Sequence, residues 1–133
     1  MSQFPSWSDE LAVGNSQIDI QHRRLVAICN RASRCAESSE VDARREFFSV
    51  LNDFATLIAE HFDAEEKFLA LNNCPTLAEH RAHHERFRER LVDLLFSGTA
   101  GLLDKKTLAR LARDYLLSHL TETDLPNKHY MRE

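Results

Sequence analysis

Long apolar stripes with a spacing of three and four residues constrain this chain more than any other feature. The longest stripe runs from Phe47 to Phe68, and two polar residues, His61 and Glu65, lie within it. Residues three or four positions apart share one face of an α-helix. The pattern therefore predicts a long helix that buries this face and the two polar residues with it.

The same periodicity recurs in four segments, which are separated by short stretches rich in Ser, Gly, Asn or Pro. We expect helices at about 19–37, 42–71, 76–96 and 104–121, after an irregular N-terminal arm over residues 1–15. No strand pattern and no internal repeat is present. Four amphipathic helices with short connections predict a single all-α domain, an antiparallel up-down-up-down four-helix bundle that takes up all 133 residues.

Composition narrows the class of protein. A formal net charge of −4 gives no electrostatic reason to expect nucleic acid as a partner. No run approaches ~18 consecutive apolar residues, so no membrane span is expected, and the N-terminus lacks the pattern of a signal peptide. The chain has an odd number of cysteines and no close Cys-x-x-Cys pair, which predicts reduced thiols and a cytoplasmic location. The three cysteines are Cys29, Cys35 and Cys74.

Five histidines and two carboxylates lie on the apolar stripes: His22, His61, Glu65, His80, His84, His119 and Asp124. A lone histidine on such a face is more often a hydrogen-bonded core residue than a ligand. Burial of the whole set is different, because an unpaired buried carboxylate costs several kcal/mol and a domain is stable by only ~5–15 kcal/mol. Bound cations remove this cost. Nitrogen and oxygen ligands without a thiolate suit iron or manganese better than structural zinc, and their number suits two ions.

The order of these residues closely resembles the hemerythrin family. The motifs are His22, His61-Phe-Asp-Ala-Glu65, His80-Arg-Ala-His-His84 and His119-Leu-Thr-Glu-Thr-Asp124. Upstream, Trp7, Val13-Gly14, Ile18-Asp19 and Gln21-His22 are similar to its bacterial single-domain branch, bacteriohemerythrin. The likeness covers nearly the whole chain, and each of the family's iron ligands has a matching residue in the right order.

The resemblance implies a non-haem di-iron centre with a bridging oxo or hydroxo group. One iron would be bound by His80, His84 and His119, and the other by His22 and His61. Glu65 and Asp124 would bridge the two irons. Counted against octahedral coordination, these ligands leave one position open, on the iron with two histidines. The implied function is reversible O2 binding for storage, transport or delivery, with NO, azide or other small anions as further ligands.

The family's oxygen pocket has apolar walls, and the matching positions here are Leu25, Phe62, Tyr115, Leu116 and Leu120. These residues are also expected to form bundle core. Phe62 is adjacent to His61 and could face outward. Tyr115 stands where bacterial relatives often have Trp. Its hydroxyl could donate a hydrogen bond to a bound ligand, or could instead reach a backbone carbonyl or the surface.

The resemblance also requires an irregular last helix. His119 and Asp124 are five residues apart, which on a straight α-helix is an angle of about 140°. For both to face one site, the turn between Leu120 and Leu125 must widen or unwind. Pro126 is expected to end this helix, and a capping box at Ser16–Asp19 is expected to begin the first one near Asp19.

The remaining polar residues near the motifs are not expected to bind the metal. His83 and His129 are expected at the surface, and Glu66 is expected to point away from Glu65. Residues that could orient the ligand histidines are Asp19, Gln21, Glu60 and Asp114.

Three functions compete with oxygen storage. One is a sensor of O2, NO or redox state that acts through a separate partner, which the sequence does not identify. Another is an enzyme that handles peroxide or NO, for which Tyr115 is the one candidate proton donor. Iron storage would need carboxylate-rich entry paths, and the sequence suggests none. We therefore expect a binding protein rather than an enzyme.

Overall fold

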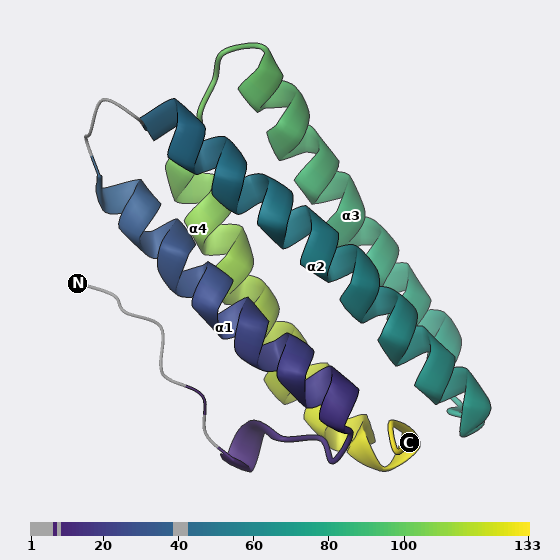
Figure 1. Ribbon diagram of the computed structural model, residues 1–133. Coiled ribbons are helices and arrows are strands. Elements are labelled where there is room, and N and C mark those ends of the chain that lie inside the picture. Colours follow the sequence, from purple (N-terminus) through teal and green to yellow (C-terminus); the bar gives the residue numbers. More distant parts are fainter. Residues whose placement is uncertain (1–6, 8, 39–42) are drawn as a thin grey trace.

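A computed structural model describes residues 7, 9–38 and 43–133. Its helices are η1 (Asp9–Leu11), α1 (Ser16–Glu37), α2 (Ala43–Leu71), α3 (Leu77–Thr99), α4 (Lys105–Asp114), η2 (Tyr115–Asp124) and η3 (Leu125–Tyr130). Successive long helices run in opposite directions, and η2 continues the line of α4 (Figure 1). No strand occurs in the described part of the chain. The predicted all-α, up-down-up-down four-helix bundle is confirmed.

The helix α1 begins three residues before the predicted start near Asp19. Asn15 is its N-cap, because its side-chain oxygen accepts a hydrogen bond from the amide of Ile18 at 3.1 Å. The Asp19 carboxylate instead accepts from the amide of Val13 at 2.8 Å, so the predicted Ser16–Asp19 capping box is wrong. The rest of the predicted irregular arm contains only η1, and residues 1–6 and 8 lie outside the described part.

The helix α3 continues through Gly98 to Thr99, beyond the predicted end at residue 96. A Cβ atom at Gly98 would lie only 3.0 Å from the ring of Phe48 and 3.2 Å from that of Phe47. The glycine therefore allows the end of α3 to approach α2 closely. The helix ends just before Gly101, which has a positive φ of 100°, and the amide of Leu102 donates to the carbonyl of Ser97 at 2.9 Å.

The fourth helix becomes irregular earlier than predicted. Regular α-helical turns end at Asp114, and wide π-type turns run over η2 from Tyr115 to Asp124. The sequence predicts the irregularity between Leu120 and Leu125, so the wide turns begin five residues earlier, at Tyr115. Pro126 does not end the helical path, because it lies in the first turn of the 3-10 helix η3, where no amide hydrogen bond is needed.

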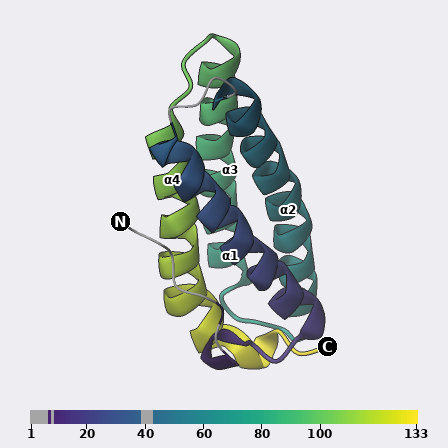
Figure 2. The same cartoon turned by 60° about the vertical axis from the view of Figure 1, so that its left-hand side comes forward.

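Residues 125–133, the C-terminal segment, fold across the end of the bundle beside the start of α1 (Figure 2). A small apolar cluster joins this segment to α1 and α2 through Ile18, Leu69 and Met131, all fully buried. The Asn72 amide donates to the carbonyls of Tyr130 and Arg132, each at 3.0 Å. These contacts hold the chain that follows Asp124 against the end of α2.

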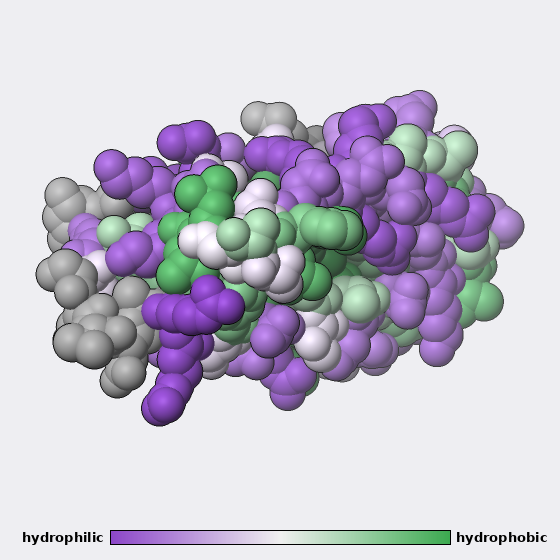
Figure 3. All heavy atoms as spheres, turned by 90° about the horizontal axis from the view of Figure 1, so that it is seen from above, coloured by the Kyte–Doolittle hydropathy of each residue, from purple (hydrophilic) through white to green (hydrophobic). Residues whose placement is uncertain are grey.

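The outer surface is largely polar. The face in Figure 3 is mostly hydrophilic, and a large apolar area near its middle has charged and polar residues around it. Within the described residues, no helix has the length and apolar character needed to cross a membrane. The histidines and carboxylates that the sequence places on the apolar stripes lie inside the bundle.

Candidate metal centre

The seven predicted ligands come from all four helices of the bundle, and each is buried, with an exposed fraction of 8% or less. The first helix supplies His22, α2 supplies His61 and Glu65, α3 supplies His80 and His84, and η2 supplies His119 and Asp124. The pairs on α2 and α3 are spaced by four residues, so ordinary helical geometry places each pair on one inner face.

His22, His61, Glu65 and Asp124 form a first group, in which one ligand atom from each residue lies within 4.8 Å of the others. The Nε2 atoms of His22 and His61 are 3.2 Å apart. The Asp124 Oδ2 atom lies 3.2 Å from His22 Nε2, and Glu65 Oε2 lies 3.3 Å from His61 Nε2. A cation could be held between these two nitrogens and two oxygens.

Glu65, His84 and His119 form a second group on the other side of the same glutamate. Its Oε1 atom lies 3.1 Å from Nε2 of His84 and 3.1 Å from Nε2 of His119. The Asp124 Oδ1 atom lies 3.0 Å from Nε2 of His119. Both carboxylates therefore have one oxygen directed at each group of histidines, an arrangement suited to two neighbouring cations.

His80 lies at the edge of the second group. Its ring centroid is 6.2 Å from that of His119 and 6.3 Å from that of His84. The Nε2 atom is buried and has no hydrogen-bond partner among the described residues. The structure thus brings six of the predicted ligands into two close groups and leaves His80 beside them with a free nitrogen.

The wide turns of η2 bring His119 and Asp124 to the same place. In a π-helix the repeating hydrogen bond joins residues five apart, so such residues lie on one face. The separation between His119 and Asp124 is also five residues. This explains how both side chains reach Glu65 although an α-helix would direct them apart.

Three ligand histidines are oriented through the nitrogen that faces away from the groups. The Nδ1 atom of His61 lies 2.9 Å from Oε1 of Gln21, and that of His84 lies 2.7 Å from Oε2 of Glu66. The Nδ1 atom of His80 lies 3.3 Å from the Thr76 carbonyl. A proton on Nδ1 leaves Nε2 free to bind a cation.

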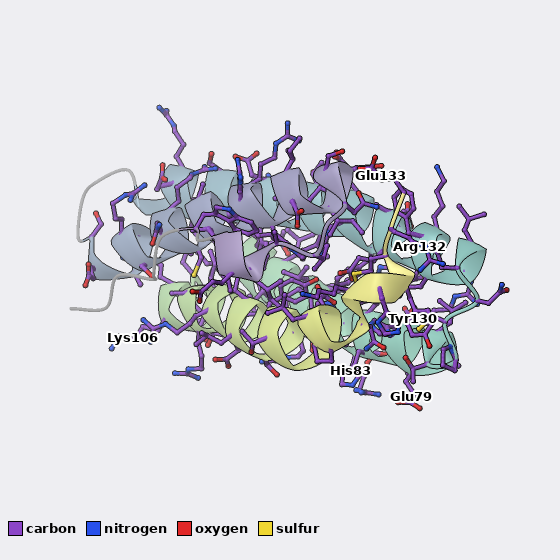
Figure 4. The ribbon with its side chains drawn as sticks, turned by 90° about the horizontal axis from the view of Figure 1, so that it is seen from below. Glu79, His83, Lys106, Tyr130, Arg132 and Glu133 are labelled. Atoms are coloured by element: carbon purple, nitrogen blue, oxygen red, sulfur yellow. The ribbon has the colours of Figure 1, made fainter. Side chains whose placement is uncertain are left out.

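Of the predicted orienting residues, Gln21 has this role, whereas Asp19 binds the amide of Val13 and Glu60 and Asp114 are exposed. Glu66, for which the sequence predicts no role, contacts the ligand residue His84. Its position, one residue after Glu65, directs it away from that residue and toward α3. Nothing in a single sequence shows that the ring of His84 lies beside Glu66. His83 and His129 are exposed as predicted, and His83 points away from the bundle in Figure 4.

The buried carboxylates need positive charge beside them. Burial alone would raise the pKa of Glu65, but His61 and His119 hold it well below its ordinary value. Burial lowers the pKa of His119, and Asp124 and Glu65 more than reverse this, raising it to about 10. Burial also lowers the pKa of His61. His119 supplies the positive charge within the protein, and a cation would take that role and require the neutral ring.

The residues present fit a pair of cations. His80 Nε2 is buried and has no hydrogen-bond partner among the described residues, and the neighbours of Glu65 Oε2 and Asp124 Oδ1 are ligand histidine nitrogens, at 3.3 Å and 3.0 Å. Buried polar atoms are rarely left unsatisfied in a native protein. Each of these atoms has a lone pair that can bind a metal ion. The nitrogen and oxygen donor set is one that iron prefers.

The predicted apolar wall is buried within one core cluster, which contains Leu25, Phe62, Tyr115, Leu116 and Leu120. Phe62 is fully buried and stacks on His84 with ring centroids 3.7 Å apart, so it faces inward. Burial, followed by the charges of Glu65 and Asp124, raises the pKa of Tyr115 well above its ordinary value. Its hydroxyl therefore stays protonated.

A surface pocket of about 610 Å³ lies between α3 and the line of α4 and η2. His84, Tyr115 and His119 form part of its wall, and Arg86 and Arg90 are among its outer residues. The pocket thus brings solvent-accessible space to the outer side of the second group.

The fold and the site define a four-helix protein that can hold two cations with histidines and carboxylates. The family model described as "Hemerythrin HHE cation binding domain" matches residues 13–125. A hemerythrin-like protein from Naegleria gruberi is 25% identical over 123 residues, which are 92% of this chain and 90% of that protein.

Two further relatives are similar over most of their length. A bacteriohemerythrin from Stenotrophomonas maltophilia is 27% identical, over 89% of this chain and 75% of the relative. A myohemerythrin from Riftia pachyptila is 28% identical, over 92% of this chain and 89% of the relative. The chain belongs to the hemerythrin family. Membership implies a non-haem di-iron domain.

Proposed function

We propose that this protein binds O2 reversibly at a pair of iron ions and stores, carries or delivers it in the cytoplasm. The observation that carries the proposal is the position of the two carboxylates. Glu65 and Asp124 each direct one oxygen toward the pair His22 and His61 and the other toward the pair His84 and His119.

In this proposal the residues keep the roles that the sequence implies. His80, His84 and His119 would hold one iron and His22 and His61 the other, and Glu65 and Asp124 would bridge them together with an oxo or hydroxo group. When bound, the iron pair supplies two electrons and one open position for O2. The protein's part is to orient the ligands through Gln21, Glu66 and the Thr76 carbonyl.

The apolar residues have a separate role in the proposal. Leu25, Phe62, Leu116 and Leu120 are exposed by at most 2%. A dry wall of this kind excludes water and anions from the first group of ligands and strengthens the electrostatic interactions within it. We expect the wall to slow irreversible oxidation of the iron.

The weak acidity of the Tyr115 hydroxyl, the one candidate proton donor, favours reversible binding over turnover of peroxide or NO. Burial raises the pKa of the Tyr115 hydroxyl, which makes it a poorer acid. General acid catalysis works best when the donor's pKa lies near the working pH. The cytoplasmic location is supported by Cys29, Cys35 and Cys74, which are free and buried.

The test is a visible-spectrum experiment on the iron-loaded protein. The protein is reduced without air, O2 is admitted, and the spectrum is followed before and after evacuation. A stable adduct that disappears under vacuum and returns with O2 supports storage or delivery. Direct conversion to the oxidised form without an adduct contradicts it and favours a sensor or peroxide chemistry.

A further inference from the structure

Tyr115 has a hydroxyl that the fold does not use. Its oxygen is buried and has no hydrogen-bond partner among the described residues. A buried hydroxyl that gives up water without gaining a partner destabilises the folded state. Phenylalanine would fill nearly the same volume without this cost. The hydroxyl therefore calls for a partner that is not part of the chain.

The ring of Tyr115 contacts histidines from both groups of ligands. It stacks on His119, with ring centroids 4.6 Å apart and planes inclined by 20°. It also meets His61 edge to face, with centroids 6.2 Å apart and an angle of 85°. Contacts with Phe62 and Phe87 complete its surroundings. The hydroxyl is thus attached to a ring that is held tightly beside the site.

The oxygen of the Tyr115 hydroxyl is not exposed to the surface pocket. Tyr115 is part of the pocket wall, but only 4% of the residue is exposed and its oxygen is closed to solvent. Because the ring stacks on His119 and meets His61, a partner that reaches the hydroxyl inside the bundle would lie beside these ligand histidines.

We propose that Tyr115 is a specificity-determining residue that donates a hydrogen bond to a small acceptor ligand, such as O2 or a small anion, held at the metal site. This inference rests on the proposed function only in requiring a metal-bound ligand. An apolar side chain at this position would complete the wall but could not distinguish acceptor ligands from others. The hydroxyl thereby lengthens the time for which such a ligand stays bound.

The test uses azide as the probe and the oxidised, iron-loaded protein. Azide is titrated while the visible spectrum is followed, for the wild type, Tyr115→Phe and the control Tyr130→Phe. Tyr130 is the other tyrosine of the chain and lies in the C-terminal segment (Figure 4). We expect Tyr115→Phe to weaken azide binding roughly tenfold, as for the loss of one hydrogen bond to a charged group. Tyr130→Phe should leave azide affinity unchanged.

Thermal unfolding of the same iron-loaded proteins separates this role from a structural one. Without azide, Tyr115→Phe should unfold at the same or a higher temperature, because an unsatisfied buried hydroxyl has been removed. Lower stability with unchanged azide affinity would mean that the hydroxyl supports the fold, and would overturn the inference. Loss of iron from Tyr115→Phe would also overturn it.

The outcome is distinguishable from failure of the proposed function. If the wild type forms no reversible O2 adduct but Tyr115→Phe still weakens azide binding, oxygen storage is wrong and the role of Tyr115 stands. If the O2 adduct forms and azide affinity is the same in both proteins, the proposed function stands and the role of Tyr115 is wrong.

Discussion

The Nε2 atom of His119 lies 3.0 Å from the Oδ1 atom of Asp124, although the two residues are five positions apart. The π-type turns of η2 produce this contact, because they place residues five apart on one face. The same turns direct the other Asp124 oxygen to His22, at 3.2 Å. One local change of helix type thus allows a single carboxylate to reach both groups of ligands.

Replacing Asp124 with Asn should lower the iron content below two per chain. The amide keeps the shape of the side chain but removes a negative charge and one metal-binding oxygen. Metal analysis after desalting measures the loss. Asp63→Asn is the matched control, since Asp63 is 83% exposed and should leave the iron content unchanged. Full iron content in Asp124→Asn would show that this carboxylate is not a ligand.

Replacing Glu65 with Ala should both release iron and destabilise the bundle. Its two oxygens serve both groups, and its loss leaves the buried positive charge of His119 with one carboxylate fewer. Breaking a buried ion pair by removing one partner costs about 3–5 kcal/mol. Urea unfolding measures this cost. His61→Ala should also lose iron, and tight retention of two irons by either variant would contradict the ligand assignment.

Replacing Glu66 with Gln tests whether the outer contact of His84 matters for the metal. The carboxylate lies 2.7 Å from Nδ1 of His84, and a neutral amide would hold the ring less strongly. Loss of such an outer partner typically weakens metal affinity by 10–100-fold. Competition with a chelator measures the affinity. Glu79→Gln, which changes an exposed residue of α3, should have no effect.

Stability without metal should fall as the pH rises. His119 has a pKa of about 10 in the folded protein against 6.5 as the ordinary value, so the folded state binds one more proton between these values. The stabilisation by protonated His119 is fully present below about pH 6.5 and is lost as the pH approaches 10. Between these values the free energy of unfolding should fall by up to about 1.4 kcal/mol per pH unit.

Urea unfolding of chelator-treated protein between pH 6 and pH 9 measures this slope. His119→Gln should flatten it, and His129→Gln, which changes an exposed residue, should not. Iron should also flatten it, because a metal-bound imidazole is neutral, and loading at neutral pH should release protons. A slope that is the same in wild type and His119→Gln would contradict this account.

Replacing Asn72 with Ala should loosen the C-terminal segment. The amide donates to the carbonyls of Tyr130 and Arg132, and its loss leaves these groups without that donor. We expect a loss of about 1–3 kcal/mol in the free energy of unfolding. Urea unfolding measures it, with the exposed Asn52→Ala as control. Faster iron release should accompany it, since the segment follows Asp124 directly.

The sequence by itself determined the bundle and the paired ligands. His61 with Glu65, and His80 with His84, were predictable because the α-helix sets the direction of residues four apart without help from the rest of the fold. The need for an irregular turn before Asp124 was predictable for the same reason. Predicted burial of the ligands also followed, since each lies on an apolar stripe.

Only the tertiary structure decided which side chains meet across helices. Three features depend on how each helix is rotated and shifted against its neighbours. They are the contact of Glu66 with His84, the hydrogen bonds from Asn72 to the C-terminal segment, and the start of the wide turns at Tyr115. That placement results from close packing of the whole core, in which many small contacts act together. No local pattern of residues specifies it.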